Sequence, residues 1–211
     1  MIETSTFGAF LIAAFLLLVI PGPAVMYIVA RGIHQGRLAG VVSALGVGAG
    51  SLVHVAAATV GLTALLVSSA LAFSVVKYAG AAYLIYLGVR TLLQRGTAYE
   101  AIALEPARLD RVFWQGVLVN VLNVKTALFF LAFWPQFVDP ARGSATGQTL
   151  VYGVIFTVMG IGSDSVYALI SGTLSGWLRR QGRLFSRQRL VAGTVYLGLG
   201  LATAVADVRK K

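Results

Sequence analysis

The chain has few of the residues that bind metals or move electrons. Among its 211 residues there is no cysteine, and there are only two histidines and seven acidic residues. Without thiols, disulfides, thiolate metal sites and thiol-based electron relays are all excluded. The histidines, His34 and His54, make a poor metal site, since one of them lies in an expected loop. The sequence therefore predicts no metal and no cofactor.

Charged residues are also scarce. They make up 11% of the chain, against about 25% in a soluble domain, while 58% of the residues are hydrophobic and the mean hydropathy is +0.84. The charges separate apolar blocks near the ~20 residues that cross a bilayer. We expect an all-α membrane protein of about six transmembrane helices in one polytopic domain, residues 1–211. The six blocks are residues 7–30, 40–66, 71–93, 112–138, 150–174 and 190–206.

The formal net charge of +10 comes mainly from basic residues in the loops between apolar segments, so we do not interpret it as a nucleic-acid-binding surface. Basic residues at the ends of apolar segments set topology and contact anionic lipids. Eleven of the seventeen basic residues fall in loops that follow the first, third and fifth blocks, and five fall on the other face. The positive-inside rule makes the richer face cytoplasmic and both termini external, although the terminal Arg209, Lys210 and Lys211 oppose this orientation.

The first apolar block is interrupted by Pro21, Gly22 and Pro23. Proline removes a backbone donor and clashes with the preceding turn, so the helix must break there. Broken backbone inside a bilayer is tolerated where protein or a water-filled cavity satisfies it, and such helices often mark a transport site. The alternative is a simple proline kink. Glu3 is the only charge before Arg31, so the block lacks the basic start of a signal peptide and is expected to be retained.

A short internal repeat indicates two halves. The sequence AGAAYL at residues 79–84 returns as AGTVYL at residues 192–197, with four of six positions identical. Halves of three segments each, about residues 1–95 and 112–207, must lie inverted in the membrane, as in many secondary transporters. Chance similarity between two Ala- and Leu-rich helices is the alternative. A true repeat predicts a second broken helix in the fourth segment.

The fourth segment contains Asn120, Asn123 and Lys125 within an apolar block. A charged lysine at mid-segment costs a few kcal/mol and normally faces a cavity or a partner. The asparagines are able to bind freed backbone groups or a polar solute. Alternatively, Lys125 reaches the membrane surface from a shorter helix that begins near Val124.

Three further features mark the second and fifth segments. Gly46, Gly48 and Gly50 form a track that suits close helix packing, or else lines a substrate path. His54 is either a proton relay or a neutral donor between helices. Asp164 is the one acidic residue deep within a segment. It has three possible roles: a structural pair with Lys125, a partner for a substrate amino group, or a proton carrier.

These motifs together resemble the LysE/RhtB family of bacterial amino-acid exporters. The resemblance covers nearly the whole chain, and its motifs stand in the expected order. The residues that carry it are Pro21-Gly22-Pro23, Arg31-Gly32, Gly36-Arg37, Gly40, Gly46, Gly50, His54, Gly61, the run KYAGAAYLIYLG at 77–88, Asn120-Val121-Leu122-Asn123-Val124-Lys125 and Phe133-Trp134-Pro135-Gln136-Phe137.

The resemblance implies a multi-pass protein of the bacterial inner membrane that exports amino acids or close derivatives by proton antiport. One departure is that the family usually has Asn-Pro-Lys in the fourth segment, whereas Val124 stands at the central position here. Valine keeps the backbone donor, so we expect a milder second break and a larger role for Asn123 and Lys125.

We therefore expect a secondary exporter, because no Gly-x-x-x-x-Gly-Lys-Ser/Thr motif and no soluble domain are present to use ATP. A membrane-embedded enzyme that uses His54 and Asp164 is the alternative, and a non-transporting scaffold ranks last. Protons, lipids and a small zwitterionic, neutral amino acid are the expected partners, and a homodimer through glycine-bearing faces is possible. The candidate binding or coupling residues are Pro21, Gly22, Pro23, Gly46, Gly50, His54, Asn120, Asn123, Lys125 and Asp164, with Tyr27, Tyr83 and Phe129 as candidate cavity aromatics.

Overall fold

A computed structural model describes residues 3–68 and 106–175, together with isolated positions in 75–93 and 194–201. Every element in the described part is helical, as the sequence predicts. The expected third and sixth segments, the repeat at 79–84 and 192–197, and Tyr83 lie outside the described residues, apart from those isolated positions.

Two helices are long, apolar and continuous. They are α3 (Arg37–Ser68) and α7 (Ala145–Thr173). The stretches Arg37–Gly61 and Ala145–Thr173, with mean hydropathies of 1.8 and 1.6, are long enough to cross a membrane. Gly36, with φ 90°, makes the turn that reverses the chain into α3.

Two further spans are broken, at the positions that the sequence predicts. The first consists of α1 (Thr4–Val19) and α2 (Pro23–Gln35), which meet at 48°. The second consists of α5 (Leu109–Val121) and the run from Val124 to Phe137, which meet at 45°. That run contains α6 (Val124–Leu128), the π-helical η1 (Phe129–Phe133) and the 3₁₀ turn η2 (Trp134–Phe137). A second short 3₁₀ turn, η3 (Pro140–Arg142), precedes α7.

The second break bends by 45° against 48° at the first, so the milder bend expected from Val124 amounts to only a small difference. The reason is that Asn123 replaces proline as the helix breaker. Its backbone is extended, and its side-chain oxygen accepts from the Lys125 N–H at 3.1 Å, which makes it the N-cap of α6.

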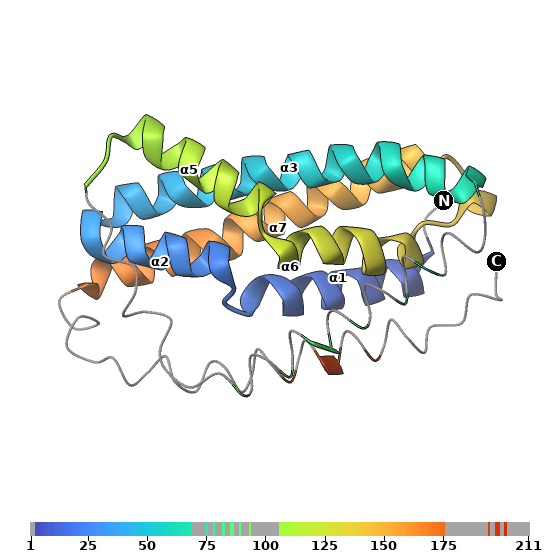
Figure 1. The fold of residues 1–211 in the computed structure, drawn as a ribbon, viewed down its shortest axis with the longest axis horizontal. Coiled ribbons are helices and arrows are strands. Elements are labelled where there is room, and N and C mark those ends of the chain that lie inside the picture. The colour runs from blue at the N-terminus through green and yellow to red at the C-terminus, as the bar shows by residue number, and fades with distance from the viewer. Residues whose placement is uncertain are drawn as a thin grey trace.

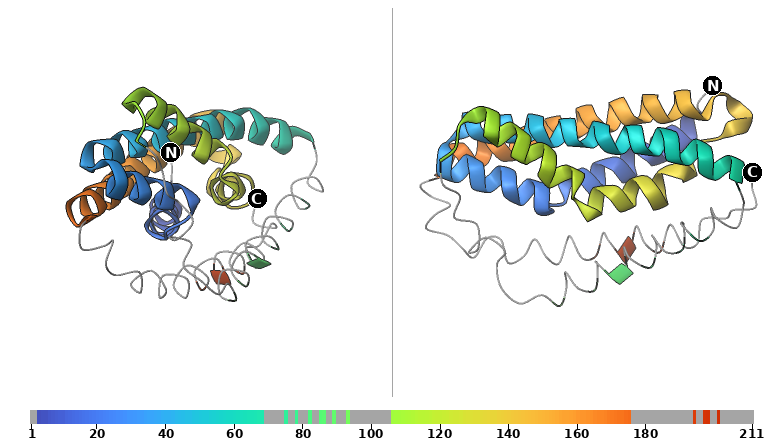
Figure 2. Two further views of the ribbon diagram at one scale, coloured as in Figure 1. Left: turned by 60° about the vertical axis from the view of Figure 1, so that its left-hand side comes forward. Right: turned by 45° about the horizontal axis from the view of Figure 1, so that its top comes forward.

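The elements form an elongated bundle (Figure 1). Helices α3 and α7 pack along each other through most of their length, and α2 packs against both. The span α1–α2 runs in the opposite direction to the span α5–α6, and α3 runs opposite to α7 (Figures 1 and 2). Among the described residues, the two spans before residue 69 therefore each run antiparallel to one of the two spans after residue 105.

Glycines set the distance between α3 and α5. A Cβ atom at Gly50 would lie 2.8 Å from the carbonyl oxygen of Val117, and one at Gly116 would lie 2.7 Å from that of Ser43. Gly46 faces the Phe113 backbone in the same way. Gly46 and Gly50 therefore pack within the bundle, on α5, and are not available there to a second copy of the chain.

The two ends of the bundle differ in chemistry. At one end, Gln35 pairs with both backbone groups of Ala107, while the buried Arg31 donates to Gln115 at 2.7 Å. At the other end the core is an aromatic cluster that joins α1, the η1–η2 run and α7. We use "aromatic cluster" for Phe10, Phe129, Phe130, Phe133, Trp134, Phe137, Tyr152 and Phe156.

Candidate functional site

The break between α1 and α2 frees backbone carbonyls that other helices then bind. In a continuous helix the Val19 carbonyl would accept from the N–H of residue 23, which proline lacks. It accepts instead from the hydroxyl of Tyr167 on α7, at 2.6 Å. The neighbouring carbonyl of Ile20 accepts from Lys125 Nζ on α6, also at 2.6 Å. The first break is thus stabilised by two donors, one from the continuous span α7 and one from the second broken span.

The second break is satisfied in the same manner. The carbonyl of Asn120, near the end of α5, accepts from the Asn123 N–H at 3.0 Å and lies 2.9 Å from His54 Nε2. A carbonyl only accepts, so Nε2 of His54 carries the proton in this contact. The His54 ring also stacks on Phe130. This is the arrangement of a histidine that donates between helices, one of the two roles open from the sequence.

The Asn120 side chain connects three helices. It is 2% exposed, and its amide nitrogen donates to the Val47 carbonyl at 2.8 Å and to Ser51 Oγ at 2.9 Å. Its oxygen accepts from Thr126 Oγ1 at 3.0 Å and from Asn123 Nδ2 at 3.4 Å. A buried amide with all of its hydrogen-bonding capacity used is expensive to disturb. Asn120 therefore fixes the geometry of the second break.

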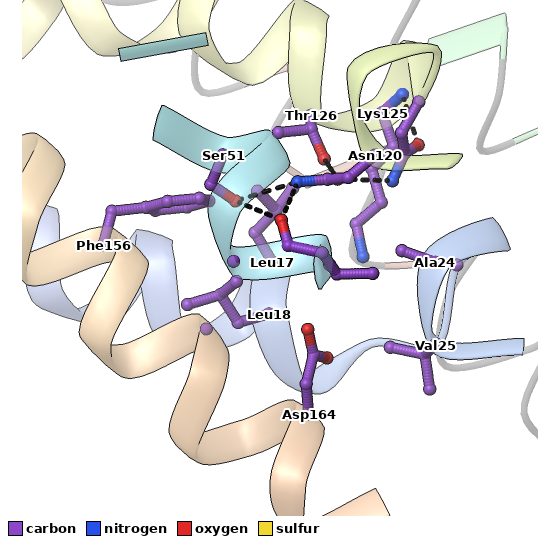
Figure 3. Close-up of a pocket in the computed structure, with 15 residues that line it drawn as sticks. Leu17, Leu18, Ala24, Val25, Ser51, Asn120, Lys125, Thr126, Phe156 and Asp164 are labelled. Carbon is purple, nitrogen blue, oxygen red and sulfur yellow. Dashed lines mark hydrogen bonds between the residues drawn. The ribbon is translucent and has the colours of Figure 1, made fainter. Parts of the chain in front are cut away.

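A buried pocket lies between the two breaks (Figure 3). Lys125 enters it from α6 and Asp164 from α7, and the two side chains point toward the same space. Of the described residues that line it, these two alone are charged. The full lining is Leu17, Leu18, Gly22, Ala24, Val25, Val47, Gly48, Ser51, Asn120, Asn123, Lys125, Thr126, Phe156, Gly160 and Asp164.

The pocket volume is about 30 Å³. A single water needs roughly 10–15 Å³ by this measure, so the space holds about two waters and no amino acid. Lys125 and Asp164 are 8% and 5% exposed, so both charges are taken out of contact with bulk solvent. A pocket that one cation and one anion line is able to neutralise a zwitterion once it enlarges.

The structure brings together part of the predicted set. Gly22, Asn120, Asn123, Lys125 and Asp164 line the pocket. Pro21 and Pro23 shape the break without lining it, His54 stands behind Asn120, and Gly46 and Gly50 pack on α5. Among the described residues no group of three metal ligands occurs.

Two of the three predicted cavity aromatics lie elsewhere, and the third, Tyr83, is outside the described residues. The Tyr27 hydroxyl donates to the Val112 carbonyl at 2.9 Å, at the Arg31 end of the bundle, and Phe129 belongs to the aromatic cluster. Of the aromatic residues that the structure describes, Phe156 lines the pocket. Sequence reasoning also missed Gly160 and Thr126 as lining residues, while it named Gly48 only within a track that either packs or lines a substrate path. Gly48 stood in the recognised glycine track and Gly160 one turn before Asp164, so helical spacing was the available signal.

Comparison with known proteins decides the family. Residues 15–206 match the model of the LysE type translocator family. The chain belongs to the LysE type translocator family. A homoserine/homoserine lactone efflux protein of Salmonella typhimurium is 30% identical over 171 residues, which cover 81% of this chain and 82% of that protein. No solved structure matches the chain.

Two other relatives of this LysE type translocator align over more of its length. An uncharacterised membrane protein of Pseudomonas aeruginosa is 30% identical over 207 residues, 96% of each chain. A leucine efflux protein of an Enterobacter species is 24% identical over 201 residues, 94% of each chain. The named activities of two relatives thus concern efflux of amino acids or their derivatives.

Proposed function

We propose that this LysE type translocator exports amino acids or close derivatives across the bacterial inner membrane as a secondary transporter, by proton antiport. The single observation that carries the proposal is that Lys125 and Asp164 face one buried pocket at the junction of both helix breaks. The efflux activities named for two relatives support the same substrate class.

The two charges have complementary roles in this proposal. Lys125 receives the substrate carboxylate, and Asp164 receives the α-amino group. The N-terminus of α2, where Ala24 and Val25 line the pocket, adds a favourable helix dipole for the carboxylate. To bind substrate, Lys125 exchanges its contact with the Ile20 carbonyl for the carboxylate, which couples binding to the first break.

The same carboxyl group supplies the coupling. A proton from outside and the substrate α-amino group compete for Asp164, so each leaves when the other binds. This competition is the simplest form of antiport, and it needs no second titratable residue. Since the closed pocket has room for about two waters, the breaks at residues 20–23 and 121–124 are where the backbone bends to admit substrate.

Two inverted halves, about residues 1–95 and 112–207 of a single domain 1–211, are the proposed architecture. The antiparallel course of α1–α2 against α5–α6, and of α3 against α7, supports it. Exposed apolar side chains such as Val60 and Val158 are the proposed lipid contacts. A homodimer stays a proposal without an assigned face.

A membrane-embedded enzyme that uses His54 and Asp164 is the less favoured proposal. Asp164 lines the pocket, whereas His54 is engaged with the Asn120 carbonyl and Phe130, outside the lining. The sequence therefore placed two candidate catalytic residues in one site, and the structure separates their environments.

The test is efflux from proteoliposomes loaded with single labelled compounds. The panel includes leucine, homoserine, lysine, glutamate and dipeptides, with an imposed proton gradient. We expect efflux of at least one neutral amino acid, and a loss of about tenfold or more in Lys125→Gln, since one charge-assisted contact is removed. Trp114→Phe, at an exposed position on α5, is the matched control and keeps wild-type efflux. Equal leakage from empty and protein-containing liposomes across the panel would refute the proposal.

A further inference from the structure

Two hydrogen-bond donors are buried in the aromatic cluster without an acceptor. Tyr152 is fully buried and Trp134 is 1% exposed. Within the described part of the chain, neither the Tyr152 hydroxyl nor the Trp134 indole N–H has a hydrogen-bond partner. Leaving such groups unpaired in a protein interior costs about 1–3 kcal/mol each, and native interiors seldom leave them so. Their presence together calls for a ligand that supplies acceptors.

The two donors belong to one wall. The rings of Trp134 and Tyr152 are 6.3 Å apart, centroid to centroid, in an edge-on arrangement. Phe10 of α1 contacts both, at 5.4 Å and 4.5 Å. The two rings that carry the donors therefore come from η2 and α7 and pack on the same ring of α1, that of Phe10.

The wall is continuous with the pocket. Tyr152, Phe156, Gly160 and Asp164 follow one another at four-residue spacing on α7, which places them along one ridge of the helix. Phe156 both lines the pocket and packs on Trp134, at 6.0 Å between centroids. Twelve residues of α-helix place Tyr152 roughly 18 Å along the axis from Asp164.

The opposing wall on α1 follows the same course. Leu17 lines the pocket and belongs to the same buried core as Phe10, two turns earlier. The core between them contains Ala13 and Ala14, which are small. The π-helical η1 lies between Lys125 and Trp134 in the second broken span, and π-helical turns often mark functional sites.

We propose that Trp134 Nε1 and the Tyr152 hydroxyl form a second binding station for the translocated substrate, the outer station, between the pocket and the end of the bundle opposite Arg31. Its ligand is a hydrogen-bond acceptor, the carboxylate of the amino acid that leaves Lys125. Phe156 separates the two stations and moves aside as the substrate passes. This inference rests on the proposed function, because it takes the ligand from it.

The decisive variant is Tyr152→Phe, which removes one oxygen and keeps the ring. Because the lost hydroxyl is unpaired in this closed state, we expect Tm to rise by about 2–4 °C. Because the same hydroxyl binds substrate on its way out, efflux of labelled L-leucine or L-homoserine falls about tenfold. Equilibrium binding of the same labelled amino acid at the pocket that Lys125 and Asp164 line is expected to be unchanged. Higher stability with slower transport is a combination that a purely structural tyrosine does not produce.

Matched controls separate the two effects. Tyr27→Phe removes a hydroxyl that is bonded to the Val112 carbonyl, so Tm falls. Thr157→Val removes the other buried hydroxyl without a partner among the described residues, one turn before Gly160, and Thr59→Val removes a bonded one from a half-buried position in α3. We expect Tm to rise in Thr157→Val. We expect efflux to be unchanged in Thr59→Val.

The outcomes are distinguishable from those of the proposed function. Wild-type efflux alone tests the export proposal, and the ratio of Tyr152→Phe to wild type tests the outer station. Unchanged efflux in Tyr152→Phe overturns the outer station while export stands. A lower Tm in Tyr152→Phe overturns it as well, because the hydroxyl would then be satisfied in the resting protein.

Discussion

At the scale of single residues, the site is defined by how buried polar groups are paired. Asn120 uses its whole amide within the protein, whereas Lys125 bonds the end of a broken helix. In the proposed function the first arrangement is fixed, and the second is exchanged for a substrate carboxylate. The sequence predicted that both residues matter, but it did not distinguish a structural amide from an exchangeable cation. Only the partners on α3 and α1 make that distinction.

Asp164→Asn tests the second charge of the pocket. An amide neither carries a proton nor neutralises an ammonium group, so we expect proton-driven efflux to be abolished in a folded, inserted protein. Substrate counterflow needs no net proton movement, and we expect it to fall about tenfold or more because the α-amino contact is lost.

The counterflow measurement separates the roles of Asp164. Full counterflow with no proton-driven efflux would leave Asp164 a proton carrier alone and contradict its contact with substrate. Normal proton-driven efflux in Asp164→Asn would contradict both roles.

At the scale of elements, the breaks were readable from the sequence, but their detail was not. Pro21 and Pro23 lack backbone donors, so the first break follows from covalent structure. The second has no proline, and its 45° bend arises because Asn123 caps α6. The sequence suggested a milder bend because valine keeps its backbone donor, whereas capping depends on a rotamer and a nearby N–H.

Val124→Pro restores the pattern that the family usually has, and we expect it to be tolerated. Val124 is the first residue of α6, where proline loses no helical hydrogen bond. Asn123 already has the extended conformation that a residue before proline requires, φ −77° and ψ 102°. Stability should stay level or rise by about 0.4–1 kcal/mol through the unfolded state.

Ala127→Pro is the matched control, three residues further along. Its N–H bonds the Asn123 carbonyl at 2.9 Å, so proline there should cost about 3 kcal/mol or more. Thermal unfolding in detergent measures both variants. Equal destabilisation of the two would contradict the capping account of the second break.

At the scale of the whole molecule, the helical class and the four described spans follow from hydropathy and block length. Hydropathy does not show which glycines of the track at 46, 48 and 50 pack on α5 and which line the pocket, because this depends on the rotation of α3 about its axis. Gly46 and Gly50 turn toward α5, while Gly48, between them, lines the pocket. Likewise, nothing in the sequence separates His54 from Asp164, since both are polar residues in apolar helices. Contacts between distant helices decide such cases.

The central claim is that one pocket holds both ends of a zwitterion, the carboxylate at Lys125 and the α-amino group at Asp164. The most direct test is inhibition of counterflow by derivatives of the best substrate from the efflux panel. We predict that the unlabelled amino acid competes fully, while its carboxamide and its N-acetyl derivative each compete about tenfold less well or worse. Equal competition by all three compounds would show that neither charged end is recognised, and would contradict the account.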